Sequence, residues 1–165
     1  MPDLDSLDHE RYVERAIALA REAGARGDGP YGSLLVVDGA VVMEETNRER
    51  TEDDVALHPE LTVARRMARE LTPGERERAV LYTSTEPCPM CSGGLSISNV
   101  GAVVYGVSGA RLAEEFGGSE GVPCGEVFER RGRDVDVVGP VLEAEALALH
   151  REFRDGDGGG GEEGN

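Results

Sequence analysis

The sequence predicts an α/β domain in which a mixed or parallel β-sheet is flanked by helices. Three observations favour this class. Helical and strand-like patterns alternate along the chain, as they do in sheets covered by helices. A chain of 165 residues can bury one good core and little more. The sequence has no internal repeat that would indicate a solenoid or an array.

The first half of the chain predicts a helix, a hairpin and a second helix. We expect the first helix over residues 7–23 and strands over residues 33–37 and 40–45. Asp38-Gly39 between these strands is a tight hairpin turn signal. A second helix begins after His58, because apolar residues follow at helical spacing: Leu61, Ala64, Ala68 and Leu71.

The second half predicts three more strands and three more helices. The apolar run at residues 79–83 is typical of a buried strand, and a helix begins near Cys88. A strand over residues 102–105 and a short helix over 110–116 precede a glycine-rich loop at 117–125. A strand over 135–138 and a last helix over 142–154 complete a single domain of residues 1–154. Residues 155–165 are glycine and acid apart from the final asparagine, so we expect a disordered tail.

The charge of the chain is strongly acidic. The formal net charge is −16, and all 17 basic residues are arginine, with no lysine. Such a surface fits a protein in concentrated salt, where self-repulsion is screened. The sequence has neither a positively charged leader nor a long apolar run, so we expect no signal peptide and no membrane span. Three cysteines that could stay reduced favour a cytoplasmic location.

Two short segments carry the chemistry: His58-Pro59-Glu60 and Pro87-Cys88-Pro89-Met90-Cys91. His58, Cys88 and Cys91 supply three ligands of the kinds that zinc prefers, and Glu60 supplies a general acid or base. Three protein ligands leave a fourth position open, which distinguishes a catalytic zinc site from a structural one.

The spacing within each segment suits a helix start. Cys88 and Cys91 lie on one side of a first helical turn, and prolines are tolerated there. His58 and Glu60 are two residues apart, so both can reach a metal only if it lies beyond the end of their helix. The sequence therefore predicts two helix N-termini that converge on one zinc ion.

Other interpretations of these residues remain open. A C-x-x-C segment after a strand is also the thioredoxin redox motif, although the upstream His-x-Glu favours zinc. Cys124 is either a fourth zinc ligand or, as we expect, a small semi-buried thiol. His9 and His150 lie in helical patterns, and we expect both at the surface.

With these residues the chain resembles the cytidine deaminase-like superfamily, whose signature is H-x-E followed by P-C-x-x-C. It is most similar to the small deaminases that include bacterial guanine deaminase, yeast-type cytosine deaminase and tRNA adenosine deaminase. The resemblance runs from about residue 12 to residue 153. It rests on residues 29–32, Asn47, residues 54–60 and residues 83–94. It implies a three-layer α/β/α sandwich with a five-stranded mixed sheet, and a homodimer.

The resemblance also implies an activity, the zinc-dependent hydrolytic deamination of a nucleobase or nucleoside. Glu60 would carry protons from water to a ring nitrogen and to the departing amine. Asn47 would hydrogen-bond the base edge, although it could also be a strand-end turn residue. Glu114 or Glu115 would read the base, and Phe153 would close the pocket or pack in the core.

Three functions are compatible with these residues. The first is an enzyme for a free base or nucleoside of the guanine or cytosine type. The second is a tRNA adenosine deaminase. Most of the arginines are interleaved with acids and form no basic surface for nucleic acid, which argues against this function. A small group at Arg130, Arg131 and Arg133 is the exception. The third is a non-catalytic zinc or redox module, which would have no need of Glu60.

Pro59 departs from the pattern of most relatives, which have a small residue with a free N–H between the histidine and the glutamate. Proline has no N–H to donate to a base. Specificity for guanine, cytosine or adenosine therefore does not transfer directly, whereas the zinc chemistry is unaffected.

Overall fold

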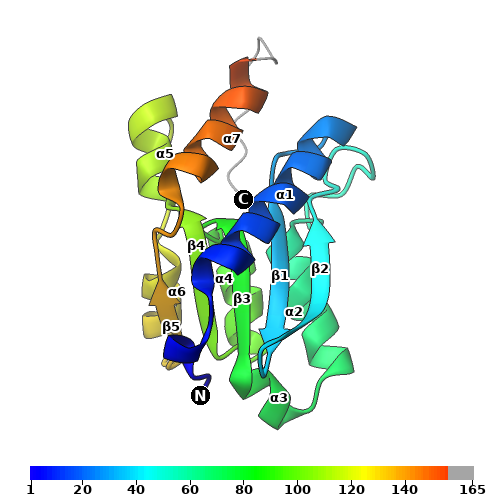
Figure 1. The fold of residues 1–165 in the computed structure, drawn as a ribbon, viewed down its shortest axis with the longest axis vertical. Helices are drawn as coiled ribbons and strands as arrows, with labels where there is room; N and C mark the ends of the chain where they lie inside the picture. Colours follow the sequence, from blue (N-terminus) through cyan, green and yellow to red (C-terminus); the bar gives the residue numbers. More distant parts are fainter. Residues whose placement is uncertain (156–165) are drawn as a thin grey trace.

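The computed structural model describes residues 1–155 and confirms the predicted class (Figure 1). In this part of the chain one sheet has five strands in the order β2-β1-β3-β4-β5. Their bounds are β1 Gly32–Val37, β2 Ala40–Thr46, β3 Ala79–Thr85, β4 Ala102–Val107 and β5 Asp136–Val138. The sheet is mixed, since β1 is antiparallel to β2 and β3, whereas β3, β4 and β5 are parallel. Of the predicted tail, only Asp155 falls within the described residues.

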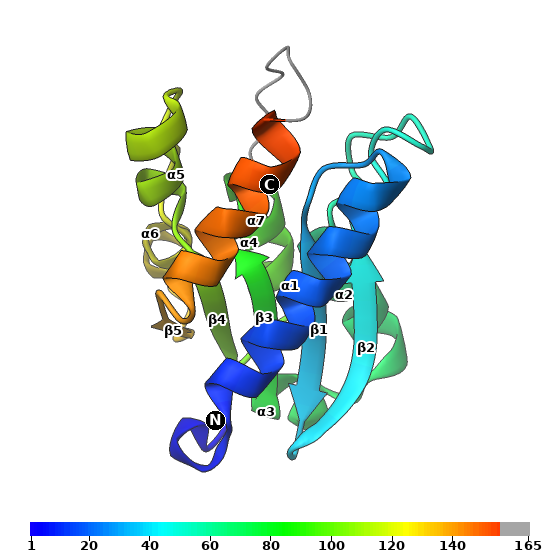
Figure 2. The ribbon, with the colours of Figure 1, turned by 45° about the horizontal axis from the view of Figure 1, so that its top comes forward.

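Helices cover both faces of the sheet and make three layers (Figures 1 and 2). One face carries α1, His9–Arg26, and α7, Glu143–Asp155. The other carries α2, Pro59–Glu70, α4, Pro89–Ile97, and α6, Cys124–Arg130. Three further pieces complete the order: a 3-10 turn at Leu4–Ser6, α3 at Pro73–Arg78 and α5 at Gly109–Phe116.

Local chemistry accounts for the ends of these elements. In the β1–β2 hairpin, Asp38 and Gly39 both have positive φ, 51° and 79°, as a type I′ turn requires. The side chain of Asp8 accepts the N–H of Arg11 at the start of α1, and Gly27 ends this helix with φ 101°. Thr72 and Glu75 form a capping box that starts α3.

The sheet separates two apolar cores. Val80, Tyr82 and Val104 face α1 and α7, whereas Leu81, Val103 and their neighbours face α2, α4 and α6. All five side chains are at most 1% exposed. The helices that carry the two chemical segments are therefore packed on the second face of a rigid sheet.

The parallel pairing places the carboxyl ends of β3 and β4 at one edge of the sheet, and the antiparallel pairing brings the start of β1 to the same edge. Ser33 of β1 is thus the direct partner of Thr83 of β3. The loop from β3 to α4 and the start of β1 lie side by side as a result.

Several expectations were wrong in detail. The glycine-rich loop expected over residues 117–125 ends in α6, where Cys124 and Phe128 are buried in the second core. Ala68 is exposed, and Val63, Ala64 and Met67 form the buried face of α2 instead. His150, expected at the surface, is 1% exposed, because α7 packs it against the ring of Tyr31.

Among the described residues, no helix combines the length and the apolar character that crossing a membrane would require.

Candidate metal centre and active site

The structure brings His58, Cys88 and Cys91 together, and one ligand atom from each lies within 4.8 Å of the other two. Nδ1 of His58 lies 3.7 Å from Sγ of Cys88 and 3.5 Å from Sγ of Cys91. His58 and Cys91 are buried, and Cys88 is half-buried. Three ligand atoms thus converge on one point.

Two helix N-termini create this arrangement, as the sequence predicts. His58 is the N-cap of α2, with Pro59 in the first turn, and Cys88 is the N-cap of α4, with Pro89 in the first turn. An N-cap residue has an extended backbone, so its side chain can point beyond the end of the helix axis. Unsatisfied N–H groups at both N-termini also favour thiolate charge.

The distances fit a tetrahedral zinc ion. With Zn–S near 2.3 Å and Zn–N near 2.0–2.1 Å, tetrahedral angles put a ligating nitrogen and sulfur about 3.6 Å apart. The two observed distances, 3.5 and 3.7 Å, bracket this value. His58, Cys88 and Cys91 would hold the ion, and the fourth position would remain for a non-protein ligand.

The three ligands influence one another's protonation. A hydrogen bond from Cys91 and then the nearby His58 lower the pKa of Cys88. The same bond, together with burial, raises the pKa of Cys91, so the negative charge of the pair concentrates on Cys88. Burial lowers the pKa of His58, but Cys88 and the charges of Glu60 and Glu49 outweigh it and leave this pKa raised.

Glu60 lies beside the ligands and is completely buried. Burial raises its pKa to about 7, against the opposing hydrogen bond from Thr83. A carboxyl group with a pKa near neutrality can both accept and release a proton, which suits a general acid and base.

A chain of hydroxyl groups holds Glu60. The hydroxyl of Thr83 donates to Oε1 of Glu60 at 2.7 Å, and Ser33 donates to the hydroxyl of Thr83 at 2.9 Å. Each hydroxyl has one hydrogen, so the order of donation is Ser33 to Thr83 to Glu60. The oxygen of Ser33 also lies 3.3 Å from the same carboxyl oxygen.

The loop from β2 to α2 contributes Asn47 and Glu49. The backbone N–H of Asn47 donates to the carbonyl of Tyr31, and its side-chain Oδ1 accepts the N–H of Glu49 at 2.9 Å. Asn47 is 1% exposed. Its amide N–H groups are the part of the side chain that could donate to a substrate. Oε2 of Glu49 lies 3.2 Å from Nε2 of His58.

The other residues expected at the site lie on α2, α5 and α7. Pro59 is buried in the first turn of α2, between His58 and Glu60. Glu114 is exposed on α5, whereas Glu115 is hydrogen-bonded to Arg151 and paired with Arg111 at 3.2 Å. Their substrate contacts stay predictions.

Phe153 and Cys124 take part in packing. The ring of Phe153 lies so close to α1 that a Cβ added to Gly24 would come within 2.5 Å of it. Cys124 is fully buried and lies outside the group of three ligands among the described residues. Burial raises the pKa of its thiol, which keeps the proton on sulfur.

The sequence interpretation did not single out three residues that contact Glu60, directly or through a neighbour, or His58: Ser33, Thr83 and Glu49. The polar run Thr83-Ser84-Thr85, at the end of an otherwise apolar strand, was a usable signal for Thr83. The position of Ser33 beside Thr83 can be deduced only once the pairing of β1 with β3 is known. Nothing in the local sequence distinguishes Glu49 from the other acids of its loop.

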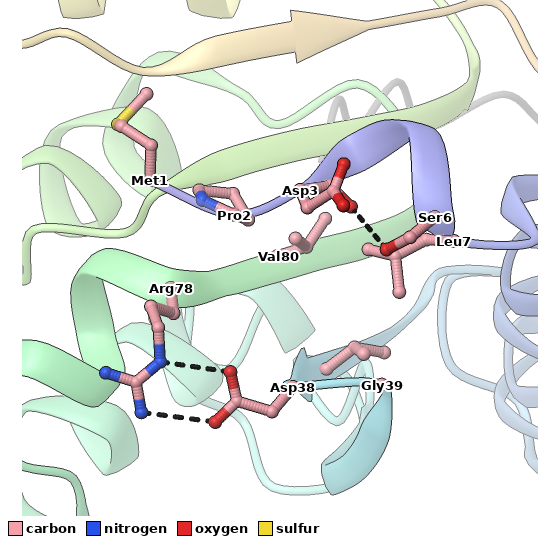
Figure 3. A pocket seen from close by; sticks show the side chains of 10 residues that line it. Met1, Pro2, Asp3, Ser6, Leu7, Asp38, Gly39, Arg78 and Val80 are labelled. Atoms are coloured by element: carbon pink, nitrogen blue, oxygen red, sulfur yellow. Dashed lines mark hydrogen bonds and ion pairs between the residues drawn. The ribbon is translucent and has the colours of Figure 1, made fainter.

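A separate pocket lies at the opposite end of β3, next to Val80 and the N-terminal segment (Figure 3). Arg78 and Asp38 line it and pair with each other at 3.0 Å. It contains none of the residues predicted for the site.

Comparison with protein families places the two segments in a known context. Residues 6–107 match the family model of the cytidine and deoxycytidylate deaminase zinc-binding region. This match covers both the His58 and the Cys88 segments.

Individual relatives are similar over most of the chain. Guanine deaminase of Bacillus subtilis is 37% identical over 109 residues, which cover 66% of this chain and 70% of the relative. The tRNA-specific adenosine deaminase of the same organism is 33% identical over 150 residues, covering 88% and 90%. The solved structure of guanine deaminase from Nitrosomonas europaea superposes with a TM-score of 0.71 at 24% identity, covering 88% and 84%. This last likeness shows that the fold is shared.

Proposed function

This chain belongs to the family of the cytidine and deoxycytidylate deaminase zinc-binding region, and on that premise we propose that it releases ammonia from a free nucleobase or nucleoside of the guanine or cytosine type. At the coarser level, the chain is a zinc-type hydrolytic deaminase. Family membership therefore decides against a non-catalytic zinc or redox module.

One observation carries the proposed chemistry. Glu60, a fully buried carboxyl group with a pKa near 7, lies next to the three ligands but is not one of them. Zinc, when bound, would lower the pKa of a water molecule to about 7 and so supply a nucleophile at neutral pH. Glu60 would accept one proton from the attacking water and pass it to a ring nitrogen. It would then take the second proton from the hydroxyl group added to the base and deliver it to the departing amine, so that a carbonyl forms as ammonia leaves. The hydrogen bond from Thr83 would keep its carboxyl group aimed during these transfers.

Substrate binding would involve the loop that carries Asn47. Its side-chain N–H groups could donate to an acceptor on the base edge, since Oδ1 is occupied by Glu49. Pro59 removes one backbone donor at the start of α2. Glu114, Glu115 and Phe153 remain candidates for base contacts, provided that α5 and the end of α7 approach a bound base.

A tRNA adenosine deaminase is the second candidate, favoured by the similarity to the Bacillus subtilis enzyme over 150 residues. Charge speaks against it. A chain of net charge −16 repels phosphates, and contacts with phosphates weaken steeply as salt rises. Within the group at Arg130, Arg131 and Arg133, the first arginine is already paired with Glu126 at 2.9 Å. A free base or nucleoside does not require a basic surface.

We further propose a homodimer in the cytoplasm. The resemblance implies the dimer, and cysteines that can stay reduced favour the location. Sedimentation in molar salt would test the dimer.

The test is ammonia release from a panel of free bases, nucleosides and related heterocycles in high salt. Wild type should react with one class, and Glu60→Gln should retain zinc while losing about 10²–10⁴-fold in rate. Cys88→Ala and Cys91→Ala should lose zinc, as metal analysis would show. Gel shifts with tRNA are the second arm. Turnover of tRNA without turnover of any free base would replace the first candidate by the second, and native activity in Glu60→Gln would refute the assigned role.

A further inference from the structure

We infer that Glu49 is a positioning residue for the metal ligand His58, holding its imidazole in the tautomer and orientation that zinc binding needs. The inference rests on the zinc site and not on the identity of the substrate. Neither the two metal-binding segments nor the match to the family assigns a role to this residue.

The two nitrogens of His58 have different neighbours. Nδ1 faces both thiols, at 3.5 and 3.7 Å, and Nε2 faces Oε2 of Glu49 at 3.2 Å. A nitrogen that binds a metal must offer a lone pair, so the proton of the neutral ring belongs on Nε2. There it can donate to the carboxylate of Glu49. The contact therefore selects the tautomer in which Nδ1 is ready to bind zinc.

The surroundings make this contact more than a surface ion pair. The side chain of His58 is only 8% exposed and that of Glu49 is 23% exposed. Little water can compete for the N–H of the ring, so loss of the carboxylate would leave a buried donor poorly satisfied. A ring without this partner can rotate or exchange tautomers, and either change moves the lone pair away from the two sulfur atoms.

The backbone of Glu49 is itself fixed. Its N–H donates to Oδ1 of Asn47, and its carbonyl accepts the N–H of Asp54 at 3.0 Å. At the next two residues, the buried carboxylate of Asp28 accepts the backbone N–H groups of Arg50 and Thr51. The carboxylate of Glu49 is thus presented to His58 from a stretch of loop that has little freedom to move.

This arrangement ties the metal ligand to the expected base contact. Asn47 and Glu49 are two residues apart in one loop and are joined by a hydrogen bond. A change that shifts this loop should affect the ligand geometry of zinc and the position of the base together. Partners of metal-bound histidines typically contribute 10–100-fold in metal affinity, and we expect Glu49 to fall in this range.

The experiment measures zinc affinity by competition with a chromogenic chelator at constant pH in molar salt. Glu49→Ala should bind zinc about 10–100-fold more weakly than wild type. Glu49→Gln keeps the length of the side chain and an oxygen that can accept from Nε2, so it should recover most of the loss. Glu52→Ala is the matched control: this acid lies in the same loop, contacts Arg48 instead of the histidine, and should leave the affinity unchanged.

A second readout separates positioning from general structural support. In thermal melts the metal-free Glu49→Ala protein should remain cooperatively folded, with a melting temperature only modestly below that of Glu52→Ala, because the N–H of Nε2 loses its partner. Glu49→Asp keeps the charge but draws the carboxylate back by one methylene, and it too should weaken zinc binding. It takes the place of the alanine variant if that variant does not fold.

Native zinc affinity in Glu49→Ala and Glu49→Asp would overturn the inference. So would a loss that Glu49→Gln does not recover, since the contact with Nε2 would then not be its cause. These measurements follow zinc and not ammonia. If the enzyme deaminates none of the free bases, the proposed function fails and the inference about Glu49 still stands. If Glu49→Ala is fully active and binds zinc with native affinity, the inference fails and the proposed function still stands.

Discussion

Replacing Thr83 by valine should displace the pH dependence of the reaction. Valine has the shape of threonine but lacks the hydroxyl that donates to Oε1 of Glu60 at 2.7 Å. This bond stabilises the charged carboxylate, and burial already disfavours that form. The pKa of Glu60 in Thr83→Val should therefore rise above its wild-type value.

The size of the displacement follows from the lost bond. A hydrogen bond to a charged group contributes about 1.5–3 kcal/mol, and a pKa unit corresponds to about 1.4 kcal/mol, so complete loss would raise the pKa by about 1–2 units. Ser33, 3.3 Å from the same oxygen, no longer donates to Thr83 and can replace part of the bond. We therefore expect about 1 unit in the single variant and more in the double variant Ser33→Ala/Thr83→Val.

The assay is the pH profile of kcat/KM with the best substrate. Glu60 acts first as a base, so the rate rises with pH as its carboxyl group ionises. At the pH that equals the wild-type pKa of Glu60, a rise of about 1 unit reduces the ionised fraction about fivefold, and it leaves the plateau at high pH unchanged. A bound zinc ion lowers the absolute pKa, but the displacement depends on the lost bond.

Ser96→Ala is the control, because it removes a buried hydroxyl that bonds to the carbonyl of Gly93 on α4 instead. Its acid limb should coincide with that of wild type. An acid limb at the wild-type pH in Thr83→Val, or a rate lowered equally at every pH, would refute the assignment of Glu60 as the titrating base.

Three further predictions concern salt, acid and substrate choice. At net charge −16 the folded protein repels itself, and 1 M salt shortens the screening length to about 3 Å, so the melting temperature should rise with salt; a flat series would contradict the halophilic interpretation. Burial lowers the pKa of His150 from 6.5 to about 4. Between these two pH values the unfolded chain binds a proton at His150 that the folded chain does not bind. The free energy of unfolding should fall by about 3 kcal/mol as the pH drops from 6.5 towards 4. Denaturant melts at several pH values should show a weaker dependence of this free energy on pH in His150→Gln. Pro59→Ala restores a backbone donor and should improve substrates that need it relative to the natural one, by up to about 10⁴-fold in a buried site; an unchanged ratio of kcat/KM between guanine, cytosine and the best substrate would reduce Pro59 to a helix-start residue.

Local sequence was enough to predict the three residues that the structure brings together as candidate metal ligands and the buried carboxyl group beside them. His58, Glu60, Cys88 and Cys91 lie in two short segments, and proline with an N-cap residue starts a helix through interactions within one turn. The direction in which these side chains point is therefore a local property. The alternation of apolar runs predicted the sheet and its covering helices in the same way, because periodicity reports which face of an element is buried.

Long-range packing determines what surrounds those four residues. Ser33 supports Thr83, and through it Glu60, only because β1 pairs antiparallel with β3 in one register, and a shift of β1 by one residue would turn the hydroxyl of Ser33 to the other face. Glu49 reaches His58 only because Asp28 and Asn47 fix the loop, which no periodic pattern encodes. Likewise, α6 forms because Cys124 and Phe128 fill the second core, and His150 is buried because α7 packs beside Tyr31. Most of these contacts join residues that are distant in the chain, and their energy exists only once the fold has closed.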